Sequence, residues 1–187
     1  NLTTRTVTSV SAPLQDTPAG IGINSVTGRA LISMNTHGYG ILLDVTGATP
    51  AITGVVTIST GPGSHVAVEP HLNWAVATPG GAGSLAIVDL NRQTSNNIVS
   101  LSRTSGIVTV TVQASTTTVP QPPLAVKPGD AVLIQGVSDT TFNGIYNVTS
   151  TGATGSLSFS YSQTNASPPD KASFTTTGKV NYADAVA

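Results

Sequence analysis

The segment YGILLDVTG, residues 39–47, is a short apolar run that ends on a carboxylate, Asp44. Only 8% of the residues in the chain are charged, so a carboxylate directly after such a run calls for an explanation. A short apolar run bounded by turn-forming residues is typical of a buried β-strand. Asp44 therefore belongs either to a functional site at the end of a strand or to a turn in a structure that repeats.

A second copy of this pattern lies 45 residues further along the chain. The shift aligns segment 40–47 with LAIVDLNR (85–92) and places Asp44 on Asp89. Both copies run from an alternating strand through a polar turn, an apolar strand and a Gly-rich turn to an apolar strand that ends in Asp. This order and spacing are typical of a β-propeller blade. The upstream matches are Ile21 on Val66, Ile23 on Val68, Ala30 on Ala75 and Leu31 on Val76.

Asp44 and Asp89 are accordingly predicted to be turn residues. At the end of a strand, an Asp side chain accepts hydrogen bonds from backbone N–H groups of the following turn. A paired-carboxylate site is the alternative, but equivalent positions on neighbouring blades lie a blade apart. We therefore expect no catalytic residue at either position.

Three segments give the first half of the chain a recognisable signature: INSVTGRALI (23–32), GILLDV (40–45) and GVVTIS (54–59). Over about residues 13–100, the sequence resembles the YVTN/NHL-like class of β-propeller repeats. The resemblance implies two propeller-like blades, whereas a closed propeller needs about four to eight. The segment TRTVTSVSAP (4–13) is a candidate strand for completing a blade of this chain or of a neighbouring subunit.

The pattern changes after the polar linker NRQTSNN (91–97). Several short strand-like segments follow, and their close, regular spacing predicts a small β-sandwich or barrel. The segment GDAVLIQGVSDTTFNGIYNVTS (129–150) resembles β-modules of bacterial and phage surface proteins, which implies a structural or adhesive role with no catalytic motif. The expected strands are 106–112, 131–137, 141–150, 156–164 and 172–180.

Turn residues are predicted within this second module as well. Asp130, which ends the segment KPGD, and Asp139 are interpreted as turn carboxylates. The dipeptide Asn143-Gly144 is a tight-turn signal, because Asn-Gly is favoured where φ must be positive. None of these residues is predicted to take part in catalysis.

We predict an all-β chain of two domains. Thr, Val, Gly and Ser are abundant, whereas Glu and Lys, which are typical of exposed helical faces, are scarce. Residues 1–96 are expected to form two propeller-like blades, or an open β-sheet unit, with an N-terminal strand. Residues 97–187 are expected to form the sandwich-like or barrel module.

The charge balance and the cysteine count exclude several classes of partner and site. Seven basic and eight acidic residues give a net charge of -1, which supplies no basic surface for nucleic acid. It supplies no polybasic segment for an anionic membrane either, and no apolar run approaches the roughly 18 residues of a membrane-spanning helix. The chain has no cysteine, which excludes disulfides, thiolate metal sites and a catalytic cysteine.

His65, Glu69 and His71 form the one candidate metal site. Two imidazoles and a carboxylate are common metal ligands, and strand alternation would place the three side chains on one face. Pro70 interrupts the strand, however, and the spacing matches no known motif, so we expect no metal and no cofactor. The sequence also lacks a phosphate-binding loop and a serine nucleophile motif, and we predict that the protein is not an enzyme.

Two kinds of surface site remain as candidates. Trp74, the single tryptophan, and Tyr39 could stack against a sugar ring, although a tryptophan between blades more commonly fills packing space. Sequons for N-glycosylation occur at Asn1, Asn147 and Asn165. Asn165 is the better acceptor, because it lies in a Pro-rich loop.

These observations favour a non-enzymatic structural protein at an extracellular or cell surface, from a prokaryote. We expect a subunit or section of a surface filament, sheath or long adhesin-like protein, assembled through β-strand edges with copies of itself or with adjoining domains. The first residue is Asn1 and not Met, which fits a processed product or an excised section. The alternative is a glycan- or protein-binding propeller module of a larger secreted protein.

Overall fold

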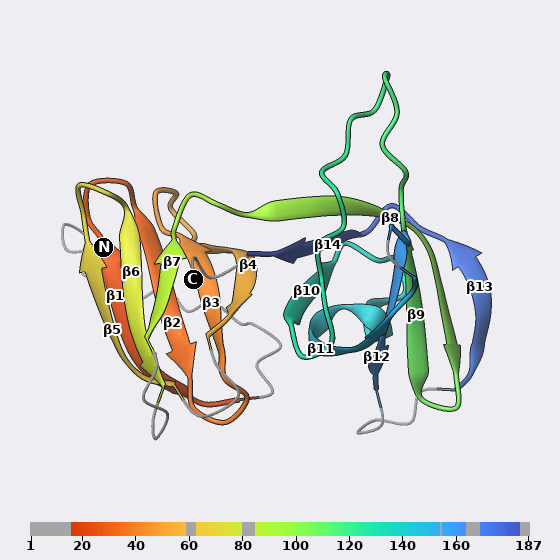
Figure 1. Ribbon diagram of the computed structural model, residues 1–187, viewed down its shortest axis with the longest axis horizontal. Helices are drawn as coiled ribbons and strands as arrows, with labels where there is room; N and C mark the ends of the chain where they lie inside the picture. The colour runs from red at the N-terminus through yellow and green to blue at the C-terminus, as the bar shows by residue number, and fades with distance from the viewer. Residues whose placement is uncertain (1–15, 59–62, 80–84, 154, 164–168, 184–187) are drawn as a thin grey trace. The chain divides into compact units, whose positions relative to one another are not determined.

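The computed structural model describes residues 16–58, 63–79, 85–153, 155–163 and 169–183 (Figure 1). Over these residues the chain is all-β, and its helical content is a single 3₁₀ turn, Thr140–Phe142. No helix in the described part of the chain has the length and apolar character needed to cross a membrane. The chain divides into two compact units, the first containing the sequence up to Gln93 and the second spanning Thr94–Ala183. The candidate strand 4–13 lies outside the described residues.

The first unit begins with a four-stranded antiparallel sheet whose strands lie in chain order. These strands are β1 (Pro18–Asn24), β2 (Arg29–Met34), β3 (Tyr39–Asp44) and β4 (Ala51–Thr57). Strand β3 lies between β2 and β4 and is buried along all but its last residue. A strand covered in this way needs the near-continuous apolar run that ends on Asp44.

A second, three-stranded sheet follows in the same unit. Its strands are β5 (Gly63–Glu69), β6 (Trp74–Pro79) and β7 (Ala86–Asp89). The residues that match β4 after a shift of 45 positions, 96–102, lie in a strand of the second unit. Among the described strands, β7 is therefore at the edge of its sheet, whereas β3 of the first sheet has β4 as a neighbour.

Both sheets pair their strands in the same register when residue numbers are shifted by 45. The β-bulge at the start of the β1–β2 pair recurs at the start of the β5–β6 pair. The repeated sequence pattern thus corresponds to a repeated backbone arrangement. Equivalent pairs include Asn24–Arg29 with Glu69–Trp74, Ile23–Ala30 with Val68–Ala75, and Leu31–Leu42 with Val76–Ile87.

The turns between these strands repeat as well. Gly28 and Asn73, at equivalent positions, have left-handed backbone conformations with φ of 65° and 56°. Asn is among the non-glycine residues that adopt this conformation most readily, so Asn73 takes the place of the glycine that the second copy lacks. The Gly28 carbonyl accepts the Val45 N–H at 2.8 Å, and the Asn73 carbonyl accepts the Leu90 N–H at 3.0 Å.

The two sheets of the first unit pack face to face, with β5 against β1 and β2 (Figure 1). Gly22 allows the strands to approach closely, because a Cβ atom at this position would lie 2.7 Å from methyl groups of both Val66 and Val68. At the turn end of the strands, the Asn24 side-chain amide donates a hydrogen bond to the Asn73 side-chain oxygen at 2.7 Å. Apolar packing and this buried hydrogen bond together fix the sheets in register.

The second unit is a closed six-stranded barrel with one further strand attached. Strand β8 pairs with β14 through its first residues and with β9 through its later ones, so the ring closes in the order β8-β14-β10-β11-β12-β9. Strand β13 also pairs with β8. The strands are β8 (Thr94–Thr104), β9 (Ile107–Val112), β10 (Ala131–Gln135), β11 (Gly144–Thr151), β12 (Ser158–Ser162), β13 (Lys171–Thr175) and β14 (Lys179–Tyr182).

The barrel encloses a core in which aromatic side chains are prominent. The rings of Tyr146 and Tyr161 stack with their centroids 4.0 Å apart, and Phe142 and Tyr161 are fully buried. Desolvation by burial, with a smaller contribution from Tyr146, raises the pKa of Tyr161 well above its ordinary value. Aliphatic members of the core include Ile98, Leu101, Val108, Val110, Val132, Ile134, Val148 and Val180.

The predicted all-β fold class with a small barrel is confirmed. The Asn143-Gly144 signal falls where the 3₁₀ turn ends and β11 begins, although Asn143 itself does not have a positive φ. The expected strand 172–180 is wrong, because β13 and β14 are separate strands. Asn143 has a φ of −73° and caps the 3₁₀ turn, and its side-chain amide bonds to the N–H and carbonyl of Val137, each at 3.0 Å. The expected linker 91–97 includes the first residues of β8, because Thr94 onward pairs with β14.

Candidate functional site

The two Asp residues of the repeat have the predicted turn role. Asp44 Oδ1 accepts the Thr46 N–H at 2.9 Å, and Asp89 Oδ1 accepts the Asn91 N–H at 2.9 Å. The hydroxyl and N–H of Thr46, with a smaller contribution from Arg29 at 3.1 Å, hold the pKa of Asp44 below its ordinary value. Both carboxylates therefore end strands and order the turns that follow.

Trp74 lies between two carboxylates on the outer face of the second sheet. Its register partners are Glu69 on β5 and Asp89 on β7, and directly paired residues point to the same side of a sheet. Val68 faces the first sheet, so Glu69, the next residue in the strand, faces away from it. Trp74 is 37% exposed. An exposed indole beside carboxylates can hold a cation over its ring, or a sugar whose hydroxyls donate to the carboxylates.

Glu69 and His71 contact each other without forming part of a larger ligand set. Glu69 Oε1 accepts the His71 N–H at 2.9 Å and lies 2.9 Å from His71 Nδ1. The backbone N–H of His71, followed by its side chain, lowers the pKa of Glu69. Among the described residues, no group of three or more His, Cys, Asp and Glu side chains is placed to hold a metal ion, so His65 does not complete a site.

Tyr39 does not form a stacking surface with Trp74, because its side chain is only 4% exposed. It also alternates along β3 with Leu42, which shares a face with Gly22 and so faces the second sheet. Tyr39 therefore points away from that sheet. Desolvation by burial, with the nearby charge of Asp16, raises the pKa of Tyr39 to about 12.

One of the three predicted glycosylation sites can be located. Asn147 lies in β11, where it pairs with Ala131, and its side chain is exposed to solvent. It alternates with the buried residues Tyr146 and Val148, so a glycan attached to Asn147 would point away from the barrel core. Asn1 and Asn165 lie outside the described residues.

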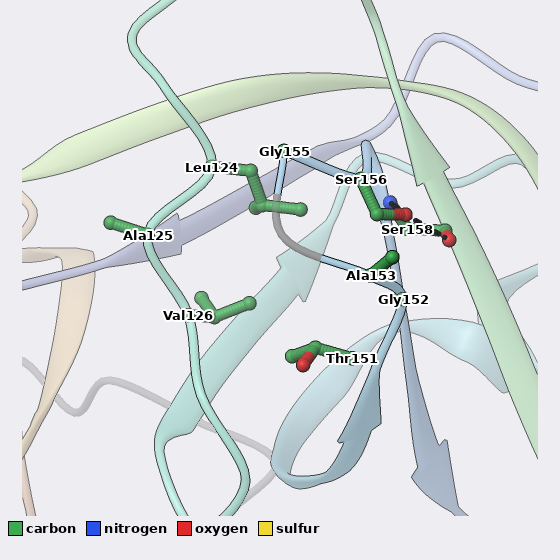
Figure 2. A pocket seen from close by; sticks show the side chains of 9 residues that line it. All are labelled: Leu124, Ala125, Val126, Thr151, Gly152, Ala153, Gly155, Ser156 and Ser158. Carbon is green, nitrogen blue, oxygen red and sulfur yellow. Dashed lines mark hydrogen bonds between the residues drawn. The ribbon is translucent and has the colours of Figure 1, made fainter.

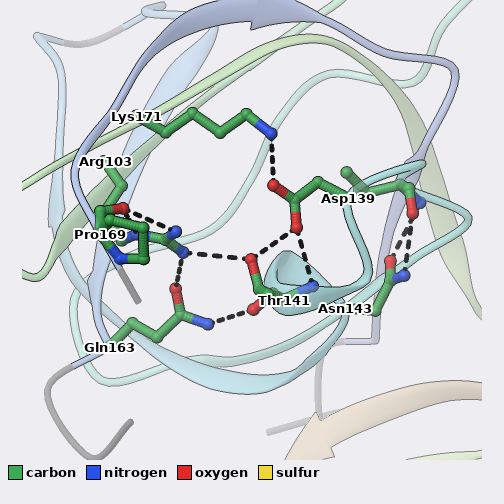
Figure 3. A network of polar contacts seen from close by, with 8 residues as sticks. Arg103, Asp139, Thr141, Asn143, Gln163, Pro169 and Lys171 are labelled. Carbon is green, nitrogen blue, oxygen red and sulfur yellow. Dashed lines mark hydrogen bonds and ion pairs between the residues drawn. The ribbon is translucent and has the colours of Figure 1, made fainter. Parts of the chain in front are cut away.

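The barrel contains a buried arginine that sequence analysis did not identify (Figure 3). Arg103 is 2% exposed. Its Nε and Nη2 atoms donate to the carbonyl oxygen of Pro169 at 3.0 and 2.9 Å, and Nη1 donates to Gln163 Oε1 at 2.8 Å. The guanidinium carbon also lies 4.5 Å from the centroid of the Phe142 ring. Neutral oxygens and a π face thus hold this cation in the barrel wall.

Asp139 and Lys171 form an ion pair next to this arginine (Figure 3). Asp139 caps the 3₁₀ turn by accepting the Thr141 N–H at 3.1 Å and the Thr141 hydroxyl at 2.7 Å. Lys171, followed by the Thr141 hydroxyl, lowers the pKa of Asp139 to about 2. Asp139 therefore has the predicted turn role and an ion pair in addition. Asp130 has a turn role too, since it accepts the Lys127 N–H at 2.9 Å.

A cavity of about 210 Å³ lies in the barrel unit, between the segment 124–126 and the turn that follows β11 (Figure 2). Its polar groups are hydroxyls of Thr151, Ser156 and Ser158, and the two serine hydroxyls are 2.9 Å apart. The side of the cavity formed by 124–126 is aliphatic. Among the described residues that line the cavity, none has a titratable side chain that could act as a general acid or base.

The sequence carried only faint signals for these contacts. Arg103 is a single basic residue in the segment LSRTSG, which predicts an exposed side chain, and its partners Gln163 and Pro169 are 60 and 66 residues away. The Asn24–Asn73 hydrogen bond was equally hidden, because Asn24 ends β1 and Asn73 lies in a turn 49 residues away. The one available sequence signal for this hydrogen bond was a polar residue, Asn24, at the end of a predicted strand of the repeat.

No known protein family matches this sequence, and no curated protein matches it. The likeness to YVTN/NHL-like propeller repeats and to surface-protein β-modules therefore stays a prediction based on the quoted segments.

Proposed function

We propose that this chain is a non-enzymatic structural protein of an extracellular surface, a subunit or section of a filament, sheath or adhesin-like protein. The observation that carries the proposal is the open construction of the first unit. Its two sheets repeat in register, yet apolar side chains remain exposed on the outer faces, including Ile21 at 56% and Ile23 at 53%. Large exposed apolar surfaces on soluble proteins commonly mark sites of association.

The edge of the second sheet supports the same proposal. Strand β7 pairs with β6, and among the described strands no further one continues that sheet beyond β7. An unpaired edge offers backbone N–H and C=O groups to a strand from another subunit. In the first sheet, β4 occupies the corresponding position. A strand donated to β7 by another subunit would therefore take the position beside β7 that β4 takes beside β3.

The low charge of the chain is consistent with a structural role. Only 8% of its residues are charged. Association would then depend on apolar and backbone contacts, which salt screens little. We expect assemblies that persist when ionic strength is raised, unlike complexes held by surface ion pairs.

Light scattering and negative-stain electron microscopy of the purified chain test this proposal. We expect concentration-dependent growth into filaments or closed rings that is retained in high salt. A monodisperse monomer throughout the micromolar to millimolar range would contradict self-assembly. Tryptophan fluorescence provides the control for folding, because Trp74 is the only tryptophan and lies in the first unit.

The exposure of Trp74 favours a second candidate function, a glycan- or protein-binding module. Its indole is 37% exposed and paired with Glu69 and Asp89. Binding of an immobilised glycan panel that disappears in Trp74→Ala and persists in Leu72→Ala would favour this function. Leu72 is the matched control because it is 60% exposed and lies in the adjoining turn.

A further inference from the structure

The packing of the two sheets within the first unit provides a template for a contact between subunits. Within the chain, β5 packs on β1 and β2. The residues of β5 that face β1 are Val66 and Val68, which lie over Gly22. Leu31 and Leu42 share the face of Gly22, because they are its register partners across the sheet.

The 45-residue equivalence assigns each outer face of the unit a counterpart on the internal interface. On the outer face of the first sheet, Ile21 and Ile23 are equivalent to Val66 and Val68. On the outer face of the second sheet, the row Ala67, Val76 and Ile87 is equivalent to the row Gly22, Leu31 and Leu42. The outer face of the first sheet therefore corresponds to the β5 side of the internal interface. The outer face of the second sheet corresponds to the side formed by β1 and β2.

If the outer faces form a contact between copies, the residues equivalent to those of the internal interface should be exposed in a single chain, and they are at least partly exposed. Ile21 and Ile23 are 56% and 53% exposed, whereas Ala30 and Val55 on the same face are fully buried. The open part of this face is thus β1, the strand equivalent to β5. On the other sheet, Ala67 is exposed and Val76 is half-buried.

We infer that copies of this chain associate head to tail, with β1 of one copy packing on β5 and β6 of the next as β5 packs on β1 and β2 within a copy. The inference rests on the proposed structural function and specifies the surface that it uses. Such a contact joins two different faces and leaves one of each free, so it propagates until the rotation between copies closes a ring. The first sheet of one copy thereby packs on the second sheet of the next copy.

The shape of the two faces fits this arrangement. Gly22 lets Val66 and Val68 approach the first sheet, and its equivalent on the outer face, Ala67, is the smallest residue that carries a side chain. The isoleucines at positions 21 and 23 conserve the β-branched shape of the two valines and add one methylene each. The larger side chains of Ile21 and Ile23, packed over Ala67, require a slightly larger distance between the sheets. The register of the contact stays the same.

Disulfide trapping tests the contact directly, because the native chain has no cysteine. A Cβ atom built on Gly22 lies 3.5 Å from the Val66 Cβ, within the Cβ–Cβ range of disulfides, which is about 3.5–4.5 Å. The equivalent pair between copies is Ala67 with Ile21. The variants Ile21→Cys and Ala67→Cys, one of them carrying a mass tag, are mixed under native conditions and oxidised. The variant Gly22→Cys/Val66→Cys/Val68→Ala calibrates the reaction, since it removes the Val68 methyl group 2.7 Å from the new Cβ and should close within one chain.

We expect the mixed Ile21→Cys/Ala67→Cys dimer to dominate over both self-linked dimers. Equal or greater yields of self-linked dimers, or the absence of cross-linking in chains that assemble, would overturn the head-to-tail contact and leave the structural function standing. A chain that stays monomeric by light scattering would overturn both the head-to-tail contact and self-assembly.

A second measurement does not depend on cysteine chemistry. Ile23→Asp places a charge in the inferred contact and should raise the concentration needed for assembly by at least about tenfold. Val26→Asp is the matched control, because Val26 is 80% exposed and lies in the turn after β1. Equal effects of the two substitutions would contradict the assigned face.

Discussion

The Asp16 carboxylate joins the residues just before β1 to the turn between β2 and β3. It accepts backbone N–H groups from Thr17 at 2.7 Å, from Thr36 at 2.9 Å and from His37 at 2.8 Å. Burial by itself raises the pKa of Asp16, but the hydrogen bonds from Thr36, His37 and Thr17 outweigh it and lower the pKa to about 2. A carboxylate with a depressed pKa stabilises the folded state only while it is ionised.

Replacing Asp16 by Asn should destabilise the first unit at neutral pH by roughly 1–2 kcal/mol. The stabilisation from Asp16 is complete above its unfolded pKa of 3.8 and is lost as pH falls through about 2. The difference between wild type and variant should therefore shrink between these two pH values. Urea unfolding followed by Trp74 fluorescence measures it. A difference that stays constant from neutral pH down to pH 2 would contradict the ionised role of Asp16.

Arg103 should be the most sensitive single position in the barrel. Arg103→Met removes the donors to Pro169 and Gln163 and leaves their oxygens without those bonds, which should lower the free energy of unfolding by about 2–4 kcal/mol. Arg103→Lys should recover only part of this, because an ammonium lacks the planar fork that reaches both partners. Arg92→Met is the control, since Arg92 is exposed and its replacement should change stability by less than about 0.5 kcal/mol. Comparable losses at both positions would mean that the buried network adds little.

Among the structural elements, those defined by local patterns could be predicted from the sequence. The apolar run 39–44, the alternation in 106–112 and the Gly- and Asn-bearing turns each carry their own signal, and each falls at an observed strand or turn. The start of β8 could not be predicted. Residues Thr94–Asn97 are polar and turn-like, and they form a strand because they pair with Lys179–Tyr182, far along the chain. Pairing between distant segments decides such cases, and local composition does not record it.

The candidate sites also divide into those that depend on neighbouring residues and those that depend on distant contacts. The roles of Asp44 and Asp89 depend on residues two positions away and were predictable. The burial of Tyr39 depends on what covers the outer face of the first sheet, and a single sequence carries no signal for that. Its position in an apolar strand gave equal support to a buried and a half-exposed ring.

The repeated turns give a prediction at the level of the sheet. Gly28→Ala should destabilise the first unit by about 1–3 kcal/mol, because φ is 65° and the new Cβ would lie 2.4 Å from a Thr46 methyl group. Gly47→Ala is a matched control at the residue next to Thr46. A Cβ at Gly47 meets its nearest atom at 3.5 Å, so stability should change by less than about 0.5 kcal/mol. Equal destabilisation by the two variants would show that the left-handed turn is not under strain from side chains.

The chain as a whole joins an open, repetitive unit to a closed one. In the first unit β1 has exposed apolar side chains, and no described strand pairs with β7 beyond β6, whereas the six barrel strands pair in a complete ring. The first and last strands of the barrel unit are neighbours, with Thr94 paired to Tyr182. Adjacent termini are a common property of domains that fold within a longer chain, because such a domain interrupts its host at one point.

The barrel unit, Thr94–Ala183, should therefore fold when expressed alone. Its ring of strand pairs and its aromatic core lie within this span, so excision breaks no strand pairing within the barrel. We expect a single cooperative transition in urea and a near-ultraviolet circular dichroism signal from Tyr146, Tyr161 and Tyr182 that is lost in the same transition. A fragment starting at Leu101 is the control, because it lacks the β8 residues that pair with β14 and cannot close the ring. A non-cooperative transition or strong dye binding by the Thr94–Ala183 fragment would mean that the ring alone does not stabilise the barrel, and that its stability depends on the first unit.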